Sequence, residues 1–130
     1  MNHAEREELV SYRINKAKET YNEVPLHIQN QLWNTCINRL YYASYYAVAA
    51  LLIKNEISTQ THAGARQMFG LNFIKTGKLS KEIGKTYSDV FDKRQTGDYE
   101  DFIDYEKQDV LELMEPVADL ISEIEKLLQK

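Results

Sequence analysis

The sequence contains few of the residues that bend, break or cross-link a chain. Among 130 residues there are 5 glycines, 2 prolines and a single cysteine, Cys36. One cysteine excludes an intrachain disulfide, which fits a reducing compartment. So few glycines and prolines argue against a sheet of many strands, because each tight turn needs such residues.

Long apolar runs and a strong net charge are also missing. The longest apolar run, residues 47–53, is far shorter than the roughly 20 residues that span a bilayer, and the charged N-terminus lacks a signal-peptide core. We therefore expect a cytoplasmic protein without a membrane partner. The net charge of −4 is mild, but residues 66–94 carry seven basic against three acidic side chains, and residues 98–130 carry eleven acidic against three basic.

What the sequence does contain is helical periodicity. The spacing of apolar residues predicts helices over about residues 4–21, 26–54, 62–76, 80–97 and 106–128. Pro25 marks the break between the first two, and Pro116 is expected to kink the last. The sequence thus predicts one all-α domain over residues 1–130, an up-and-down bundle of four to five helices.

Arg39 stands out because it lies in the most apolar of these predicted helices. A guanidinium cannot lose its charge by deprotonation, and burying it without a partner is costly. On a helix, Thr35, Arg39, Tyr42 and Tyr46 share one face. The helix is therefore predicted to have a core face and a second face of aromatic residues and arginine.

Arg94 lies on the apolar face of the helix predicted over 80–97, so its charge also needs a partner or a function. Two acids, Asp98 and Asp101, follow it closely. We expect Arg39 and Arg94 to lie in or beside one polar cleft with one of these acids as partner. Two interpretations stay open, a structural ion pair and a site that binds a ligand, because both produce perturbed charges.

His62 lies at the predicted start of a helix, where backbone N–H groups can bind a phosphate. A loop residue without a role is the alternative interpretation. No group of His, Cys, Asp and Glu has metal-site spacing, and no phosphate-binding glycine loop is present, so neither a metal nor a cofactor is expected. The candidate catalytic residues are Arg39, His62 and Arg94, and the candidate polar cleft consists of Arg39, Tyr42, Tyr46, His62, Arg94, Asp98 and Tyr99.

The aromatic and small residues of the helix over 26–54 exceed what one bundle core needs. Tyrosines are more typical of cores and interfaces than of catalytic sites, and alanines let a second helix approach closely. We therefore predict a homodimer in which residues 42–50 contribute to the interface.

Four motifs occur in order along the chain: Asn38-Arg39-x-Tyr41-Tyr42-Ala43, Thr61-His62-x-Gly64, Phe73-Ile74-Lys75-Thr76-Gly77-Lys78-Leu79, and Arg94-Gln95-x-Gly97-Asp98-Tyr99-x-Asp101-Phe102. Together they resemble the small prokaryotic HEPN domains. The resemblance implies a dimerising helical bundle and, for many members, pairing with a minimal nucleotidyltransferase as toxin and antitoxin. Active members are metal-independent RNases that use an Arg followed a few residues later by a His.

This chain departs from that signature. Tyr46 stands where relatives often carry the His after Arg39, and Asp98 and Tyr99 fill the space after Arg94. An unperturbed Tyr, with a pKa of about 10, moves protons poorly near neutral pH. We expect a toxin–antitoxin-type component that binds or acts on a nucleotide or RNA with weak or absent RNase activity, and whether it is an enzyme stays open. The alternatives are a non-catalytic module that binds a nucleotidyltransferase, and a degenerate RNase that still binds RNA.

Overall fold

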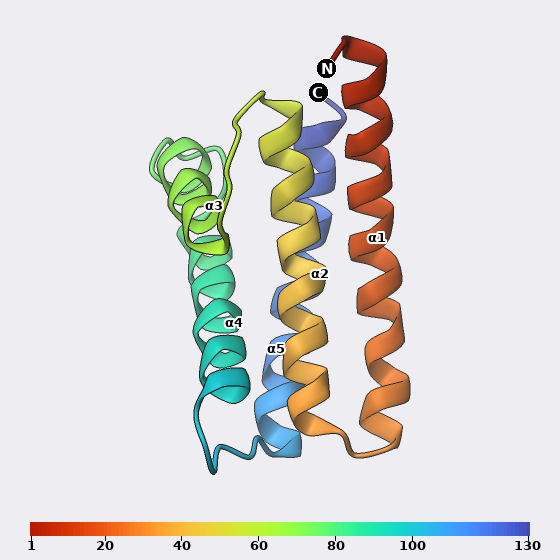
Figure 1. Ribbon diagram of the computed structural model, residues 1–130, viewed down its shortest axis with the longest axis vertical. Helices are drawn as coiled ribbons and strands as arrows, with labels where there is room; N and C mark the ends of the chain where they lie inside the picture. Colours follow the sequence, from red (N-terminus) through yellow and green to blue (C-terminus); the bar gives the residue numbers. More distant parts are fainter.

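Five α-helices make up the computed structural model, which describes residues 1–130 (Figure 1). They are α1 (His3–Gln29), α2 (Trp33–Lys54), α3 (His62–Phe69), α4 (Lys81–Tyr99) and α5 (Lys107–Leu128), and a π-helical turn, η1 (Gly70–Ile74), extends α3. There is no β-strand. The prediction of an all-α helical bundle is confirmed.

The boundary between α1 and α2 differs from the prediction. Helix α1 continues through Pro25 to Gln29, and the chain turns at Gln31, which has a φ of 58°. Pro25 removes one backbone donor but does not end the helix, because Val24 beside it is completely buried in the core. The predicted helix starting at residue 26 was therefore wrong, since α2 begins at Trp33.

The other helix ends follow local sequence signals. The side chain of Asn2 accepts a hydrogen bond from the Glu5 amide at the start of α1, and that of Ser80 accepts from the Ile83 amide at the start of α4. Gly77 has a φ of 78°, a conformation that favours glycine, after η1. Helix α5 includes Pro116 without ending there.

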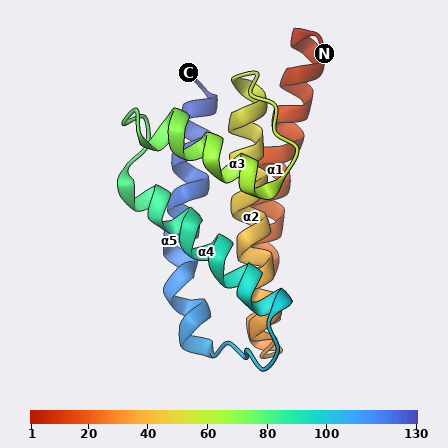
Figure 2. The ribbon, with the colours of Figure 1, turned by 60° about the vertical axis from the view of Figure 1, so that its left-hand side comes forward.

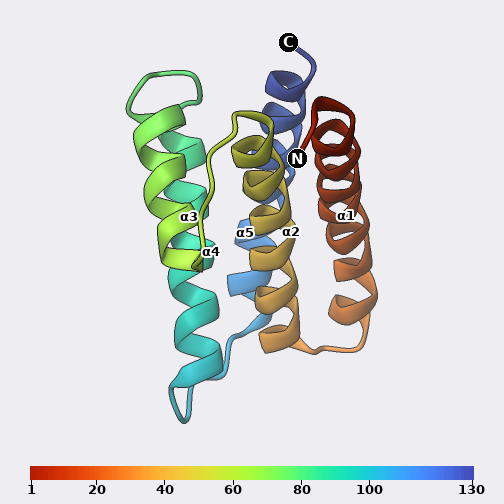
Figure 3. The same ribbon diagram turned by 45° about the horizontal axis from the view of Figure 1, so that its top comes forward.

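Helix α2 is the central element of the bundle. It lies between α1 and α4, with α5 behind it (Figures 1 and 3). Helix α4 crosses the long axis at a tilt, and α3 lies beside it (Figure 2). The core contains 27 buried hydrophobic residues, and the largest fully buried side chains are Tyr41 of α2 and Tyr87 of α4. Most of α2 is thus used in packing.

The alanines of α2 belong to this core. Ala43, Ala47 and Ala50 are completely buried within the chain's own bundle, whereas Ala49 is half-buried. The argument that these four small residues leave room for a second copy was therefore wrong for three of them. Their small size serves packing between helices of the same chain.

Candidate functional site

One stripe of α2, the helix that lies between α1 and the α3–α4 pair (Figure 1), remains half-exposed. Side chains from α3 and α4 join it. We call this set the tyrosine–arginine cluster, and it consists of Arg39, Tyr42, Tyr45, Tyr46, His62 and Arg94. All six side chains are half-buried, so each combines a fixed position with access to solvent.

Tyr42 lies at the centre of the cluster. The guanidinium carbon of Arg39 is 5.1 Å from the centre of its ring, and that of Arg94 is 5.3 Å away. Arg94 also donates a hydrogen bond of 3.1 Å to the Tyr42 hydroxyl. Cations over an aromatic face are attracted by its quadrupole. One tyrosine ring therefore positions two arginines that are 55 residues apart in the sequence.

Arg39 has no acidic partner, contrary to one of the two expectations for it. Its Nε and one terminal nitrogen donate to Oδ1 of Asn38, at 3.1 and 2.8 Å. The Asn38 amide nitrogen in turn donates to Oδ2 of Asp98 at 3.2 Å. Asp101 is exposed and forms no ion pair. The link from Arg39 to Asp98 is thus indirect, and Arg39 keeps its positive charge uncompensated.

Arg94 does contact an acid. Its Nε lies 2.9 Å from Oδ2 of Asp98, one helical turn further along, although the N–H does not point at that oxygen. Rings of Tyr41 and Tyr99 lie 5.4 and 5.5 Å from its guanidinium carbon. The side chains of Arg94 and Asp98 are 18% and 33% exposed, so water screens this pair in part. Arg94 thus lies near the surface with one acidic neighbour.

His62 joins the cluster from the start of α3, where Thr61 caps the helix by accepting from the Gly64 amide. Its ring stacks on that of Tyr45, with centres 4.4 Å apart, and its Nδ1 is hydrogen-bonded to the Tyr41 hydroxyl. Burial and the charge of Arg94 lower the pKa of His62. The ring is thus neutral at neutral pH, when it lacks the proton that a general acid must donate.

Tyr41 is the hydrogen-bond partner of His62 within the site. Burial raises the pKa of Tyr41 to about 12, so this phenol keeps its proton at neutral pH. The neutral imidazole donates from one ring nitrogen and accepts at the other, and its tautomer decides which of the two roles Nδ1 has toward Tyr41. The cluster as a whole presents two guanidinium groups, an imidazole ring and several aromatic faces.

Two predicted cleft residues lie at the margins of the cluster. Tyr46 is one turn further along α2, with the guanidinium of Arg13 at 6.0 Å from its ring centre. Tyr99 is 71% exposed at the end of α4. The prediction missed Tyr41 and Arg13 as neighbours of the site. The motif containing Tyr41 was a usable signal, but nothing in the sequence places Arg13 of α1 over α2.

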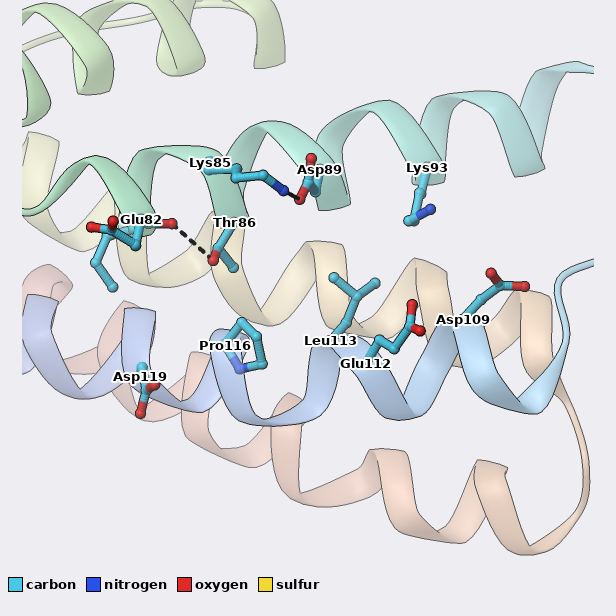
Figure 4. A pocket seen from close by; sticks show the side chains of 11 residues that line it. Glu82, Lys85, Thr86, Asp89, Lys93, Asp109, Glu112, Leu113, Pro116 and Asp119 are labelled. Carbon is cyan, nitrogen blue, oxygen red and sulfur yellow. Dashed lines mark hydrogen bonds and ion pairs between the residues drawn. The ribbon is translucent and has the colours of Figure 1, made fainter.

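A sizeable pocket lies away from this cluster, between α4 and α5 (Figure 4). Its volume is about 630 Å³. Lys85 forms a 2.8 Å ion pair with Asp89 there. Its lining includes five carboxylates and two lysines, namely Glu82, Asp89, Asp109, Glu112, Asp119, Lys85 and Lys93. This acidic pocket repels phosphate, so size does not make it the candidate site.

Two general properties complete the description. No group of three or more His, Cys, Asp or Glu side chains is arranged to hold a metal ion. None of the helices combines the length and the apolar character needed to cross a membrane.

These features define a small all-α protein in which Arg39 and three tyrosines of the central helix meet His62 of α3 and Arg94 of α4 on one face. The sequence profile of the HEPN domain matches residues 10–127, and the chain belongs to this family. A UPF0332 protein of Thermotoga maritima is 34% identical over 125 residues, which are 96% of this chain and 95% of that protein. A Methanocaldococcus jannaschii protein named "Putative toxin MJ0142" is 31% identical over 96 residues, which are 74% of this chain and 65% of that protein. The resemblance seen in the sequence is confirmed, and pairing with a nucleotidyltransferase stays a prediction.

Proposed function

We propose that this protein is a toxin-like HEPN component that binds single-stranded RNA on the half-exposed face of α2 and cleaves it weakly or not at all. The toxin role is supported by the names of two Methanocaldococcus jannaschii relatives, which are 31% and 30% identical. The choice of RNA as ligand is supported by the chemistry of the tyrosine–arginine cluster.

The observation that carries the proposal is the pair of arginines held over the Tyr42 ring. A guanidinium matches phosphate geometry and can bind it through two N–H groups. Single-stranded nucleic acid is bound by such cations together with aromatic rings on which bases stack, each stack being worth about 1–3 kcal/mol. Tyr42, Tyr46 and the exposed Tyr99 offer rings of this kind beside the arginines.

Cleavage requires more than binding. A base must remove the proton of a 2′-hydroxyl, cations must stabilise the charged intermediate, and an acid must protonate the leaving oxygen. Arg39 and Arg94 can provide charge stabilisation. His62 is the only histidine of the cluster, and its lowered pKa leaves it without the proton that the last step needs at neutral pH. Positioned acid–base groups typically contribute about 10²–10⁴-fold, so we expect little or no RNase activity.

Two assays with the same proteins test this proposal. Fluorescence anisotropy should show that single-stranded RNA binds the wild type and binds Arg39→Ala and Arg94→Gln about tenfold more weakly, a change of about 1.4 kcal/mol. Lys85→Gln removes a positive charge from the acidic pocket and is the matched control. Absence of binding to any RNA would overturn the proposal.

Incubation with total RNA and with transfer RNA measures cleavage separately. We expect no products above background from the wild type. Robust cleavage that is lost in both His62→Ala and Arg39→Ala would show that His62 acts as the base, and it would overturn the expectation of weak activity.

We also propose that the chain forms a homodimer in which the 42–50 segment of α2 lies at the edge of the interface, so that the tyrosine–arginine clusters of the two copies stay open to solvent. Two copies joined there would bring two sets of arginines to one seam. Sedimentation at tens of micromolar, a concentration that detects weak association, is expected to give a dimer. A monomer under these conditions would rule this arrangement out.

A second candidate function is a non-catalytic module that binds a minimal nucleotidyltransferase. The favouring observation is the end of α4 and the loop after it, where Tyr99 is 71% and Phe102 100% exposed. Phe102 also has a φ of 64°, unusual for such a residue. Exposed aromatic residues are typical of interfaces. If a nucleotidyltransferase gene lies beside this one, the two proteins should co-purify, and Phe102→Ser should abolish that co-purification. Phe102→Ser should leave RNA binding intact, which would separate partner binding from RNA binding.

A further inference from the structure

A second pocket, of about 510 Å³, adjoins the tyrosine–arginine cluster at the end of α2 that lies nearer the start of α1. Its walls come from α1, the second half of α2, the 55–61 connection and the buried Ala65 of α3. The ring of Tyr45 separates it from the tyrosine–arginine cluster, because Tyr45 lines this pocket and stacks on His62. The two sites are therefore adjacent, and no residue of the cluster other than Tyr45 lines the pocket.

One wall of the pocket is cationic. Arg6 and Arg13 both line it and lie seven residues apart on α1, so they share one face of that helix. The Nε of Arg13 is shielded from solvent and has no hydrogen-bond acceptor, and no acid pairs with this side chain. Arg13 therefore lines the pocket with a charge that no acid of its own chain neutralises.

Arg6 has a partner that can be displaced. It pairs with Glu56 at 3.3 Å, and the Glu56 side chain is 72% exposed whereas that of Arg6 is 20% exposed. A pair with one largely solvated member contributes little. A dianionic phosphate placed between Arg6 and Arg13 would offer both guanidinium groups stronger, charge-assisted hydrogen bonds.

The opposite wall suits a flat, largely apolar group. Ala49, Ile53 and Ile57 line it, and the hydroxyls of Ser58 and Thr59 border it. Ligand pockets of about 300–1,000 Å³ that combine apolar walls with a few polar groups are the usual binding sites for small molecules. A ribonucleotide has this combination, since its base is flat and its sugar carries hydroxyls.

We propose that this pocket binds the phosphate monoester of a terminal nucleotide, with the phosphate between Arg6 and Arg13 and the base against Ala49 and Ile53. The nucleotide is either free or the end of an RNA strand. In the second case the proposal rests on the proposed function, since the strand would continue from the pocket past Tyr45 into the tyrosine–arginine cluster. Ser58 and Thr59 donate to the sugar or phosphate oxygens.

Calorimetric titration with the four ribonucleoside monophosphates, the matching nucleosides and inorganic phosphate tests the pocket alone. We expect at least one monophosphate to bind about tenfold more tightly than its nucleoside, and Arg13→Gln and Arg6→Gln each to remove that preference. Arg66→Gln is the matched control, because Arg66 lies outside the pocket and pairs with Asp92 at 3.1 Å. Thermal unfolding verifies that each variant is folded, and Arg6→Gln is expected to be tolerated because its partner is exposed.

Oligonucleotides distinguish the two sources of the phosphate. If strand ends bind here, an RNA carrying a 5′- or 3′-phosphate should bind about tenfold more tightly than the same RNA with hydroxyl ends, and only in proteins with Arg13. If free nucleotides alone bind, monophosphates bind but phosphorylated and unphosphorylated strands do not differ.

Failure of the pocket and failure of the proposed function give different results. The pocket is rejected if no monophosphate binds at millimolar concentration and phosphorylated and unphosphorylated strands do not differ, or if Arg6→Gln and Arg13→Gln leave the binding unchanged. RNA with hydroxyl ends that fails to bind, or binds equally to Arg94→Gln, counts against the tyrosine–arginine cluster instead.

Discussion

The face of α2 and the acidic pocket between α4 and α5 are both rich in charged groups, yet they are built differently. At α2, Arg39 and Arg94 of α4 are held against the Tyr42 ring, and only Arg94 pairs with an acid, Asp98. Between α4 and α5, five carboxylates outnumber two lysines (Figure 4). The comparison shows that neither volume nor charge count identifies a binding site. Arginines fixed by aromatic packing, and short of acids, are prepared for an anion.

Substitutions in the two regions are expected to differ most in their effect on the free energy of unfolding. Tyr41→Ala removes a completely buried ring that contacts five other tyrosine, phenylalanine or histidine rings at the base of the cluster, and it should cost about 3–5 kcal/mol. Glu112→Ala on the acidic pocket should stay within about 0.5 kcal/mol of the wild type. Urea unfolding measures the free energy of unfolding of both variants, and equal losses would contradict the expected difference between the two regions.

Arg39 should matter for binding and hardly for folding. Arg39→Ala loses two hydrogen bonds to Asn38 on a half-exposed side chain, so we expect a stability loss below about 1 kcal/mol. RNA affinity should fall about tenfold. A loss of about 3–5 kcal/mol, the usual effect of breaking a buried ion pair, would show that Arg39 is structural after all.

His62 should make the free energy of unfolding of the protein depend on pH. Burial and the charge of Arg94 lower its pKa in the folded state, below the ordinary value of about 6.5. The unfolded chain then binds more protons below that pH, so stability is complete above about pH 6.5 and declines as the pH falls. Urea unfolding should show a smaller decline for His62→Gln, and an unchanged decline for His3→Gln. Equal declines in both variants would contradict the conclusion that His62 causes the loss of stability at low pH.

The smallest effect is expected from neutralising carboxylates of the acidic pocket, measured as a change in RNA affinity. Asp89→Asn and Glu112→Gln together reduce repulsion of RNA at a distance, and should raise its affinity less than about threefold at low salt, with the gain lost at high salt. Anisotropy titrations at two salt concentrations measure this. A larger gain that persists at high salt would mean that RNA contacts the acidic pocket directly.

Much of the fold could be predicted because its signals are local. Ser80, Gly77 and the apolar stripe of α5 mark their helix ends and faces within a few residues. The end of α1 could not be predicted, because what carries the helix past Pro25 is the burial of Val24 by the rest of the bundle. Local rules gave the wrong boundary where tertiary packing outweighed them.

The candidate site also has contacts that local sequence spacing predicts and contacts that depend on the tertiary fold. Arg39 and Tyr42 lie one turn apart, and so do Arg94 and Asp98, so helical spacing predicts both contacts. The contact of His62 with Tyr41 and Tyr45 depends on how the 55–61 connection returns α3 to α2. No local pattern contains that information. The role of the three buried alanines was also invisible, since the sequence does not say which helix covers them.

Photo-crosslinking most directly tests whether RNA binds on α2. A single-stranded RNA containing 4-thiouridine is irradiated with the wild-type protein, and mass spectrometry identifies the crosslinked residues. We expect crosslinks at Tyr42, Tyr46 and Tyr99, reduced in Arg94→Gln and unchanged in Lys85→Gln. Crosslinks that lie mainly on α5 or on Lys85 and Lys93 of the acidic pocket would contradict the proposed site.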